Sequence, residues 1–450
     1  MRLRLRLSSI QHRRSARPSW LRRAHRLLAL SFFWAAAACS DPGESATLTV
    51  WAHAGQPSER RVMQTLVAKF QQRYPHERVA VTFLPEGTYH AQVQAAAAAG
   101  ELPDIVELDG PLVPRFVWQQ LLVELDTLLP EQRTANLLPS IIEQGSFAGR
   151  LFAVGMFDSG LALYARRSNL EQHGIRIPTH PRAAWTRNEF EKILADLAAD
   201  DLDGAVLDLK LNYTGEWFTY AFQPLFRSAG ASLLPSAGST TVAALDGPRS
   251  EALLRRLQRW IVEDRYVDPN TDDRAFIDGR VGVSLSGHWE YGRNSAAFGD
   301  DLLVLPLPDL GYGSKSAQGS WMWAITKASI ARPRAAAFLA FLLEAEQILA
   351  MTSANGAIPA TVDAIRASDR FGQDSPAHLF VTQLKEGFTV PRPRTPAYPV
   401  VTIAIQRLLY DVRTGESVGP AAVNAARRIS RELAIVAGEA KEVTTDNDAQ

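Results

Sequence analysis

The segment AFIDGRVGVSLSGHW, residues 275–289, combines a strand-like run with the glycine, histidine and tryptophan that follow it. Within it, Val281–Leu285 has the β-branched, alternating pattern of a buried strand, and polar residues follow immediately. Gly287 has no Cβ, so its backbone permits close approach by another group. His288 and Trp289 combine a polar ring with a large aromatic face. We therefore expect Gly287, His288 and Trp289 to contact a small molecule at the end of this strand.

Outward from that stretch, the N-terminal part of the chain alternates short apolar runs with helical periods. Pro75 and Gly100 each close a helical period. We expect the carboxyl ends of these strands to lie at one edge of a parallel sheet, where ligands bind in open α/β folds. The expected strands are 48–51, 79–83 and 103–108, and the expected helices are 60–74 and 89–99.

The rest of the chain continues the same α/β pattern. Thr186–Glu189 has the spacing of a capping box and predicts a helix start. The expected strands are 161–165, 281–285, 302–305 and 321–326, and the expected helices are 186–199, 216–229, 248–264, 272–278 and 333–351, with mostly helix after 396. The sequence has no long linker, which favours two lobes joined by several crossings over separate domains in series.

Composition and charge exclude several classes of protein. A chain of 450 residues is too long for one core, and its 46% hydrophobic content is that of a globular protein. Residues 1–38 hold nine arginines and no acid, so the remaining chain has 39 basic and 48 acidic residues, or a net charge of −9. This balance argues against nucleic acid or anionic lipid as a partner.

The N-terminus has the layout of an export signal. A basic region precedes the apolar run 27–38, which is too short for an ordinary membrane span and ends in small residues. The sequence Ala36-Ala-Ala-Cys39 is similar to a bacterial lipobox, although Ala36 stands where that motif usually has Leu. We expect a signal peptide over 1–38 and lipidation of Cys39, the single cysteine. Cleavage without lipidation and an uncleaved anchor are the alternatives. Residues 39–45 read as a flexible tether.

Several motifs, in order, resemble one family along residues 46–440. They are TLTVWAHAG at 47–55, PDIVELDG at 103–110, LALYARRSNLEQHGI at 161–175, WTRNEFEKILADLA at 185–198, AFIDGRVGVSLSGHW at 275–289, LPLPDLGYGSKSAQGSWMWAITKAS at 305–329, RPRAAAFLAFLLEAEQ at 332–347, NGAIPA at 355–360 and GES at 415–417. The chain is identified by these motifs as a member of the bacterial extracellular solute-binding protein family 1, whose members include sugar-binding lipoproteins of ABC importers similar to the maltose- and glycerol-phosphate-binding proteins.

The resemblance implies a two-lobed α/β periplasmic-binding-protein fold of type II, with hinge connections and a ligand cleft between the lobes. By analogy, lobe 1 comprises 46–157 and 322–370, and lobe 2 comprises 158–321 and 371–450. Phe157–Ser159 and Trp321–Trp323 then lie at or near the hinge.

Aromatic and polar side chains at predicted strand ends are the candidates for ligand contact, because sugar rings pack on aromatic faces and their hydroxyls bond polar groups. The candidates at or beside strand ends outside 275–289 are Trp51, His53, Tyr89, Asp109 and Trp321. The family resemblance adds Asp158 at the hinge, Glu216 and Trp217 at the start of a cleft helix, and Arg392 where the cleft closes. Each has an alternative explanation. Trp51 suits a core position, Asp109 suits a helix N-cap, and Asp158 suits a polar hinge. Arg392, together with Tyr398, suits an exposed surface.

Motifs for chemistry or metal binding fail on inspection. The segment Asp201-Leu-Asp-Gly204 lacks acids at the first and last positions of a calcium loop, and no zinc-protease or nucleophile-elbow motif occurs. We expect no catalytic residues, no metal and no cofactor. The expected function is binding of a carbohydrate or polyol and its delivery to the transmembrane subunits of an ABC permease, by an exported, lipid-anchored monomer at the outer face of the cell membrane or in the periplasm. The alternatives are a sensor or chemotaxis receptor of the same fold, a glycerol-phosphate binder, and a secreted glycoside hydrolase or lyase.

Overall fold

The computed structural model describes residues 47–234, 245–269 and 271–447. Its first sheet has five strands in the order β2-β1-β3-β13-β6. The strands are β1 (Leu48–His53), β2 (Val79–Leu84), β3 (Ile105–Asp109), β6 (Ala153–Val154) and β13 (Trp321–Ile325). β1 pairs in parallel with β2 and β3, whereas β13 pairs antiparallel with β3 and β6. Apolar residues such as Leu48, Val50 and Ile105 are fully buried in this sheet.

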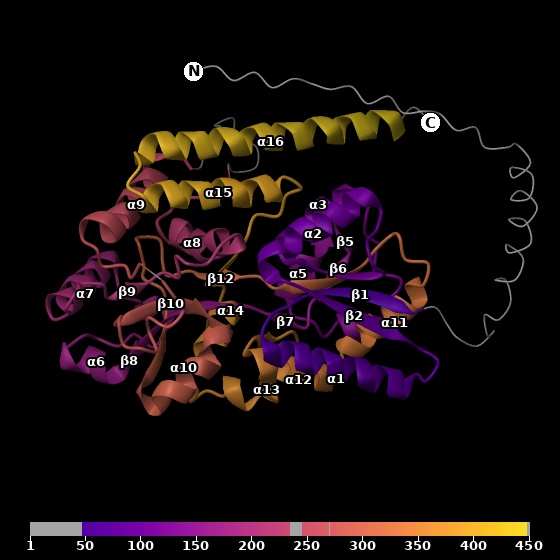
Figure 1. Ribbon diagram of the computed structural model, residues 1–450, viewed down its shortest axis with the longest axis horizontal. Coiled ribbons are helices and arrows are strands. Elements are labelled where there is room, and N and C mark those ends of the chain that lie inside the picture. Colours follow the sequence, from indigo (N-terminus) through magenta and orange to yellow (C-terminus); the bar gives the residue numbers. More distant parts are fainter. Residues whose placement is uncertain (1–46, 235–244, 270, 448–450) are drawn as a thin grey trace, which may run out of the picture. The chain divides into compact units, whose positions relative to one another are not determined.

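Helices cover the first sheet and complete lobe 1 (Figure 1). On α1, Phe70 packs against Phe338 and Phe341 of α11, with ring centroids 5.0 and 5.4 Å apart. Gly100 ends α2 in the left-handed conformation with φ 72°, which a residue with a Cβ rarely adopts. The helices of this lobe are α1 (Pro57–Arg73), α2 (Glu86–Ala99), α3 (Val113–Trp118), α4 (Glu131–Thr134), α5 (Pro139–Gly145), α11 (Arg332–Leu342), α12 (Ala345–Asn355) and α13 (Val362–Arg366).

The second sheet has four strands in the order β11-β8-β10-β9 and forms lobe 2. β8 pairs antiparallel with both β10 and β11, and β9 pairs in parallel with β10. Its strands are β8 (Leu161–Arg166), β9 (Leu207–Asp208), β10 (Val283–Gly287) and β11 (Leu302–Leu305), and its helices are α6 (Arg167–Gln172), α7 (Arg187–Ala199), α8 (Glu216–Ser228), α9 (Pro248–Gln258), α10 (Tyr291–Phe298) and α14 (His378–Lys385). The expected capping box is present at the start of α7 between Thr186 and Glu189.

The chain crosses between the sheets more than once, and short strand pairs hold the crossings together. β7 (Phe157–Asp158) pairs with β14 (Ile358–Pro359), and β12 (Ser316–Gln318) pairs with β15 (Thr389–Pro391). Asp158 is completely buried, and its Oδ1 accepts the backbone N–H groups of Ser159, at 2.7 Å, and Gly319, at 3.2 Å. Asp158 thereby joins two crossing segments. The proposed lobe boundaries at 157/158, 321/322 and 370/371 stay predictions.

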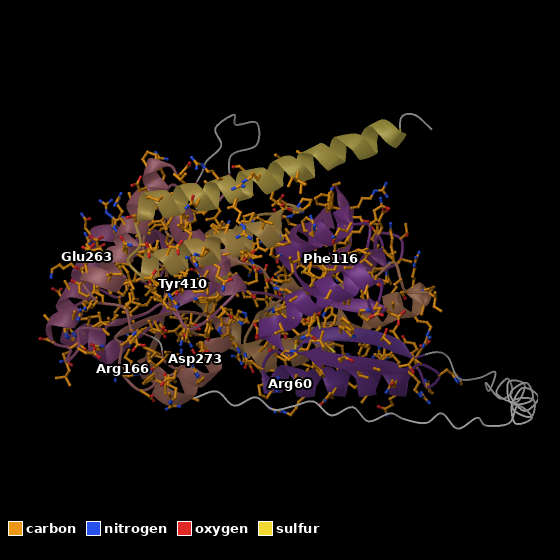
Figure 2. All side chains as sticks on the ribbon, turned by 45° about the horizontal axis from the view of Figure 1, so that its top comes forward. Arg60, Phe116, Arg166, Glu263, Asp273 and Tyr410 are labelled. Carbon is orange, nitrogen blue, oxygen red and sulfur yellow. The ribbon has the colours of Figure 1, made fainter. Side chains whose placement is uncertain are left out.

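Two long C-terminal helices pack on lobe 2. α15 (Tyr398–Arg413) lies against α8, and α16 (Val418–Asn447) lies along α15 and extends toward α3 (Figure 1). Glu432 of α16 approaches Arg115 of α3, with 3.9 Å between Oε1 and Nη1. Because of this approach, the C-terminal helix is a further contact between the lobes. Figure 2 shows Phe116 and Arg60 in lobe 1, with Asp273 and Tyr410 in lobe 2.

The first three strands pair in parallel as expected, and the sheet as a whole is mixed because β13 runs opposite to them. Two sequence-based expectations about secondary structure are wrong. Residues 272–278 form turns, since the Asp272 carboxylate accepts the N–H of Arg274 at 2.9 Å and competes with a helical pattern. The expected helix 333–351 is split into α11 and α12, because Glu344 is extended and its carboxylate accepts from Arg73 and Arg133 of other segments.

In the part of the chain that the structure describes, no single helix combines the length and apolar composition of a membrane span. The pair α11 and α12 meets the criterion of composition and length only when taken together, and the two are bent by 66°.

Candidate ligand-binding cleft

A cavity of about 1040 Å³ lies between the two lobes. This volume is at the upper end of the range for small-molecule sites. Its walls come from strand ends and helix starts of both lobes, from the crossing segment Gly319–Trp321 and from α15. The lining residues are His53, Gly55, Gln56, Glu59, Glu86, Gly87, His90, Ala91, Gln94, Asp109, Leu112, Phe157, Ser159, Asn212, Tyr213, Thr214, Gly215, Glu216, Trp217, Tyr220, His288, Trp289, Glu290, Arg293, Gly319, Ser320, Trp321, Asn355, Arg392, Pro399, Thr402, Ile403 and Gln406.

The lobe 1 wall is built around a stack of His53 on Trp321. The two rings are 3.8 Å apart between centroids and only 4° from parallel. His53 ends β1 and Trp321 begins β13, so the sheet brings together residues far apart in the sequence. Tyr89 meets the Trp321 ring edge-on at 5.5 Å. Its own hydroxyl donates to the carbonyl of Glu107, which leaves Tyr89 fully buried behind the wall.

His53 is held by the carboxylate of Glu107. The Glu107 Oε2 atom lies 2.7 Å from His53 Nδ1 and also accepts the His53 backbone N–H at 3.0 Å. Burial by itself lowers the pKa of His53, but the charge and hydrogen bond of Glu107, with smaller effects of Glu59 and Glu86, raise the pKa to about 9. The imidazole of His53 is therefore a cation at neutral pH.

The lobe 2 wall is a cluster of aromatic rings at the end of β10 and the start of α8. Trp289 meets Trp217 at 6.1 Å between centroids and 76° between planes, and it meets Tyr220 at 6.1 Å. A Cβ at Gly287 would come within 2.1 Å of the Trp289 ring. Glycine at 287 thus permits the indole of Trp289 to fold back over the strand end.

His288, beside Trp289, forms contacts that join the lobes. Its Nδ1 lies 3.4 Å from the carbonyl of Asn355 on α12, and its Nε2 lies 3.2 Å from the hydroxyl of Ser159 at a crossing. Burial lowers the pKa of His288 to about 3, because neither neighbour carries a charge that would compensate for lost hydration. A neutral ring that donates from Nδ1 and accepts at Nε2 satisfies both contacts.

Arg392 links the walls through a buried ion cluster. Its Nη1 donates to Asp109 Oδ2 at 2.5 Å and to Glu216 Oε2 at 2.9 Å, and its Nη2 also donates to Asp109. The Tyr398 hydroxyl donates to the same Glu216 carboxylate. Asp109 ends a lobe 1 strand and Glu216 begins a lobe 2 helix, so one guanidinium connects the lobes. The guanidinium also lies 5.1 Å from the Tyr220 ring centroid, within cation–π range.

This cluster overturns two alternatives considered from the sequence. Asp109 occupies the N-cap position of the short 3-10 turn Gly110–Leu112, but its side chain makes no capping hydrogen bond and bonds Arg392 instead. Arg392 is only 7% exposed and Tyr398 is fully buried, so neither is a surface residue. The sequence gives no sign of this burial, because the partners of Arg392 lie up to 283 positions away.

Several polar atoms on the cavity wall are buried and have no hydrogen-bond partner among the described residues. They include His90 Nε2, Gln94 Nε2, Ser320 Oγ and Arg392 Nε. An unpaired buried polar group costs about 1–3 kcal/mol. A ligand that carries many donors and acceptors can satisfy such groups when it binds.

The structure brings most of the predicted contact residues to the cavity. His53, Asp109, Glu216, Trp217, His288, Trp289, Trp321 and Arg392 line it. Trp51, Tyr89, Asp158 and Gly287 are not among its lining residues. Trp51 packs partly buried against the core, and Tyr89 and Asp158 are buried behind the wall. The backbone carbonyl of Gly287 is taken by the Tyr164 hydroxyl at 2.8 Å.

Sequence reasoning missed other lining residues. Glu59, Glu86 and His90 lie on helices of lobe 1, and Tyr220 lies one turn after Trp217 on α8. The signal for Tyr220 was available, because residues three apart on a helix share a face. For Glu59 and Glu86 no pattern separated cavity acids from solvated ones.

The chemistry available at this site is recognition by stacking, hydrogen bonding and charge. Among the described residues, no group of three or more His, Cys, Asp or Glu side chains is placed to hold a metal ion. The Asp109 and Glu216 carboxylates are both held by one guanidinium.

Comparison with known proteins identifies the family. Residues 65–378 match the family described as bacterial extracellular solute-binding protein. The fold is similar to that of the GacH receptor of Streptomyces glaucescens, solved unliganded and with acarbose, with TM-score 0.73, 21% identity, and coverage of 86% of this chain and 98% of that chain. It is also similar to maltose-bound MalE3 of T. maritima, with TM-score 0.73, 21% identity, and coverage of 87% and 100%.

A third similar structure is UgpB of Mycobacterium tuberculosis in complex with glycerophosphocholine. It has TM-score 0.73 and 19% identity, and the match covers 86% of this chain and 98% of that chain. These likenesses confirm the two-lobed α/β periplasmic-binding-protein fold. Since the matched segment spans well over half of its 450 residues, the chain belongs to the bacterial extracellular solute-binding protein family.

Proposed function

We propose that this protein binds a carbohydrate in the cleft between its lobes and delivers it to an ABC permease. The observation that carries the proposal is the cavity between two aromatic walls, Trp321 on lobe 1 and Trp289 on lobe 2, with unpaired buried polar atoms between them. A sugar ring presents an apolar C–H face to an indole and hydroxyls to polar groups, so its chemistry matches both features.

The related structures support the same ligand class. Maltose is bound to MalE3 and acarbose to the GacH receptor, and both proteins share this fold. Glycerophosphocholine bound to UgpB keeps a glycerol phosphate as the alternative ligand. The cavity residues themselves favour a neutral sugar over a phosphate, because Arg392, a buried cation of the cavity, is already bonded to two carboxylates.

The proposed mechanism is closure of the lobes around the ligand. A ligand that contacts both walls binds the closed arrangement more tightly than the open one, so it shifts the population toward the closed state. Asp109 and Glu216 contribute from opposite lobes to the cluster around Arg392, so closure also assembles this ion cluster. The closed form would then present one composite surface to the permease.

Two rival functions remain as alternatives. A sensor or chemotaxis receptor would use the same binding step with a different membrane partner. A secreted glycoside hydrolase or lyase would turn over an oligosaccharide, and such turnover by the purified protein would replace the binding proposal.

The test is a titration of the protein from Ser40 onward with mono-, di- and oligosaccharides and glycerol phosphates, followed by tryptophan fluorescence and melting temperature. We expect a carbohydrate to raise the melting temperature and to change the fluorescence of Trp289 and Trp321. No response from folded protein to any carbohydrate, with a response to a glycerol phosphate, would overturn the proposed ligand class.

We also propose that the protein is exported and acts as a monomer anchored through a lipid at Cys39. The expected signal peptide 1–38 and the whole tether 39–45, including Cys39, lie outside the described residues, so the support is the lipobox-like sequence and the extracellular family. Cys39→Ser is expected to release the protein from membranes into the soluble fraction. A variant that still sediments with membranes would contradict the anchor.

A further inference from the structure

The wall of the cavity carries more negative than positive charge. Five carboxylates line it, from Glu59, Glu86, Asp109, Glu216 and Glu290. The cationic groups on it are the guanidinium groups of Arg293 and Arg392 and the imidazolium of His53. Arg293 is bonded to Glu290, and Arg392 is shared between Asp109 and Glu216. Every one of these cations is therefore already matched by at least one carboxylate.

The surplus of negative charge is concentrated on lobe 1, where Glu59 lies at the start of α1 and Glu86 at the start of α2. Among the described residues, the carboxylate of Glu59 accepts from two neutral donors, the Gln56 N–H at 2.6 Å and the Asn355 side-chain amide at 3.0 Å. Neither Glu59 nor Glu86 forms an ion pair with another described residue. Both attract the imidazolium of His53 at longer range. His53 itself is bonded to Glu107. One imidazolium thus faces three carboxylates and bonds a single one.

A second feature indicates that the cavity receives a ligand with hydrogen-bonding groups. Ser320 is 3% exposed and Arg392 is 7% exposed, and each contributes a buried polar atom, Oγ or Nε, without a partner among the described residues. Both line the same cavity as Glu59 and Glu86. Attraction between charges is several times stronger in a partly desolvated cleft than in bulk water. Indole faces such as that of Trp321 add to the attraction for a cation.

We infer that the cleft selects saccharides that carry a protonated amine, and that Glu59 and Glu86 supply this selectivity. The inference rests on the proposed carbohydrate function and narrows its ligand class. A phosphorylated sugar or glycerol phosphate would meet the same carboxylates as like charges, so the cleft rejects it. The amine approaches the lobe 1 wall, while the rings of the saccharide pack on Trp321 and Trp289.

The experiment compares matched pairs of saccharides by calorimetry at about pH 6, where amino sugars are protonated. One pair is the β-1,4-linked glucosamine disaccharide and its di-N-acetyl form. The other is maltose in which a primary amino group replaces one primary hydroxyl, and maltose itself. Glycerol 3-phosphate is the anionic probe. In whichever pair binds, we expect the amine-bearing saccharide to have an affinity about tenfold or more higher than that of its neutral partner. This difference in affinity should disappear at high salt.

The variants locate the effect. Glu59→Gln with Glu86→Gln should remove the preference for the amine, so that the two members of the pair bind with similar affinity. Glutamine can replace Glu59 in the capping box of α1, so the helix start is retained. Glu101→Gln, an exposed lobe 1 acid outside the cavity, is the matched control and should change neither affinity.

The outcomes separate the two proposals. Equal or tighter binding of the neutral member, or binding of glycerol 3-phosphate in preference to both, would overturn the amine selectivity. Neutral binding alone would still leave the carbohydrate function in place. An amine preference that survives the double substitution would overturn the role of Glu59 and Glu86. Binding of no saccharide at all would overturn the proposed function and this inference with it.

Discussion

Two histidines on opposite walls of one cavity differ in charge, because His53 is a cation and His288 is neutral. The pKa of His53 on lobe 1 is about 9, and the pKa of His288 on lobe 2 is about 3, against an ordinary value of 6.5. Burial disfavours the charged form of both. Only His53 has a carboxylate within bonding distance, because Glu107 lies beside it, whereas His288 meets a carbonyl and a hydroxyl.

Residue type and burial therefore do not decide whether these two histidines are charged. The nearest partner decides it, and in both cases that partner comes from a distant segment. The lobe 1 wall consequently has a cation among carboxylates, whereas the lobe 2 wall is an aromatic surface on which the charged groups of Glu290 and Arg293 are paired with each other.

Arg392→Met should have the largest effect, because Arg392 is the group that both walls share. Its loss leaves the carboxylates of Asp109 and Glu216 buried without their cation, and breaking such a pair costs about 3–5 kcal/mol of the free energy of unfolding. Urea unfolding measures this loss. Arg394→Met is the control, since Arg394 is more exposed and should cost about 1 kcal/mol or less. Equal losses in the two variants would refute the cluster.

The charge of His53 should make stability fall at alkaline pH. Its pKa is raised in the folded state, so its contribution is complete below pH 6.5 and disappears as pH rises through about 9. The contribution is about 3 kcal/mol at most. The difference in free energy of unfolding between the wild type and His53→Gln should therefore shrink over this interval. A difference independent of pH would show that His53 is neutral in the folded protein.

His288 should produce the opposite slope. Its pKa is depressed in the folded state, so its contribution is present above pH 6.5 and is lost as pH falls toward 3, when the unfolded chain alone takes up the proton. Between pH 6.5 and about 4.5 the loss is roughly 2–3 kcal/mol. His288→Gln should flatten this acid limb relative to the wild type. An unchanged acid limb in the variant would contradict the depressed pKa.

Trp289→Ala should weaken ligand binding by about 1–3 kcal/mol, because it removes the aromatic face of the lobe 2 wall. Calorimetry with the saccharide found in the titration measures the change. Trp118→Ala, on α3 and outside the cavity, is the matched control. Unchanged affinity in a folded Trp289 variant would remove this residue from the site.

Trp51→Phe should have the smallest effect on binding. The sequence placed Trp51 at a strand end as a candidate contact, but it is not among the lining residues and packs against the core of lobe 1. We expect the affinity to change by less than about 0.5 kcal/mol, as for substitutions remote from a site. A large loss of affinity, with the melting temperature preserved, would return Trp51 to the cleft.

The sequence by itself determined the α/β class, most strands and helices, the family and eight residues of the cleft. These features depend on local rules: period, caps, glycine and proline, and the residues that follow a strand. The capping box at Thr186 and the loop after β10 are examples, since all their determinants lie within a few positions.

Tertiary structure decided the rest, because the causes lie far apart in the chain. It turned β13 antiparallel, buried Arg392 against Asp109, and placed Tyr89 and Asp158 behind the wall. It also placed a carboxylate beside His53, which is therefore charged, and a carbonyl and a hydroxyl beside His288, which is therefore neutral. A pattern read along the sequence cannot contain these results, since a buried group's charge depends on which distant donor or acceptor the fold brings within about 3 Å.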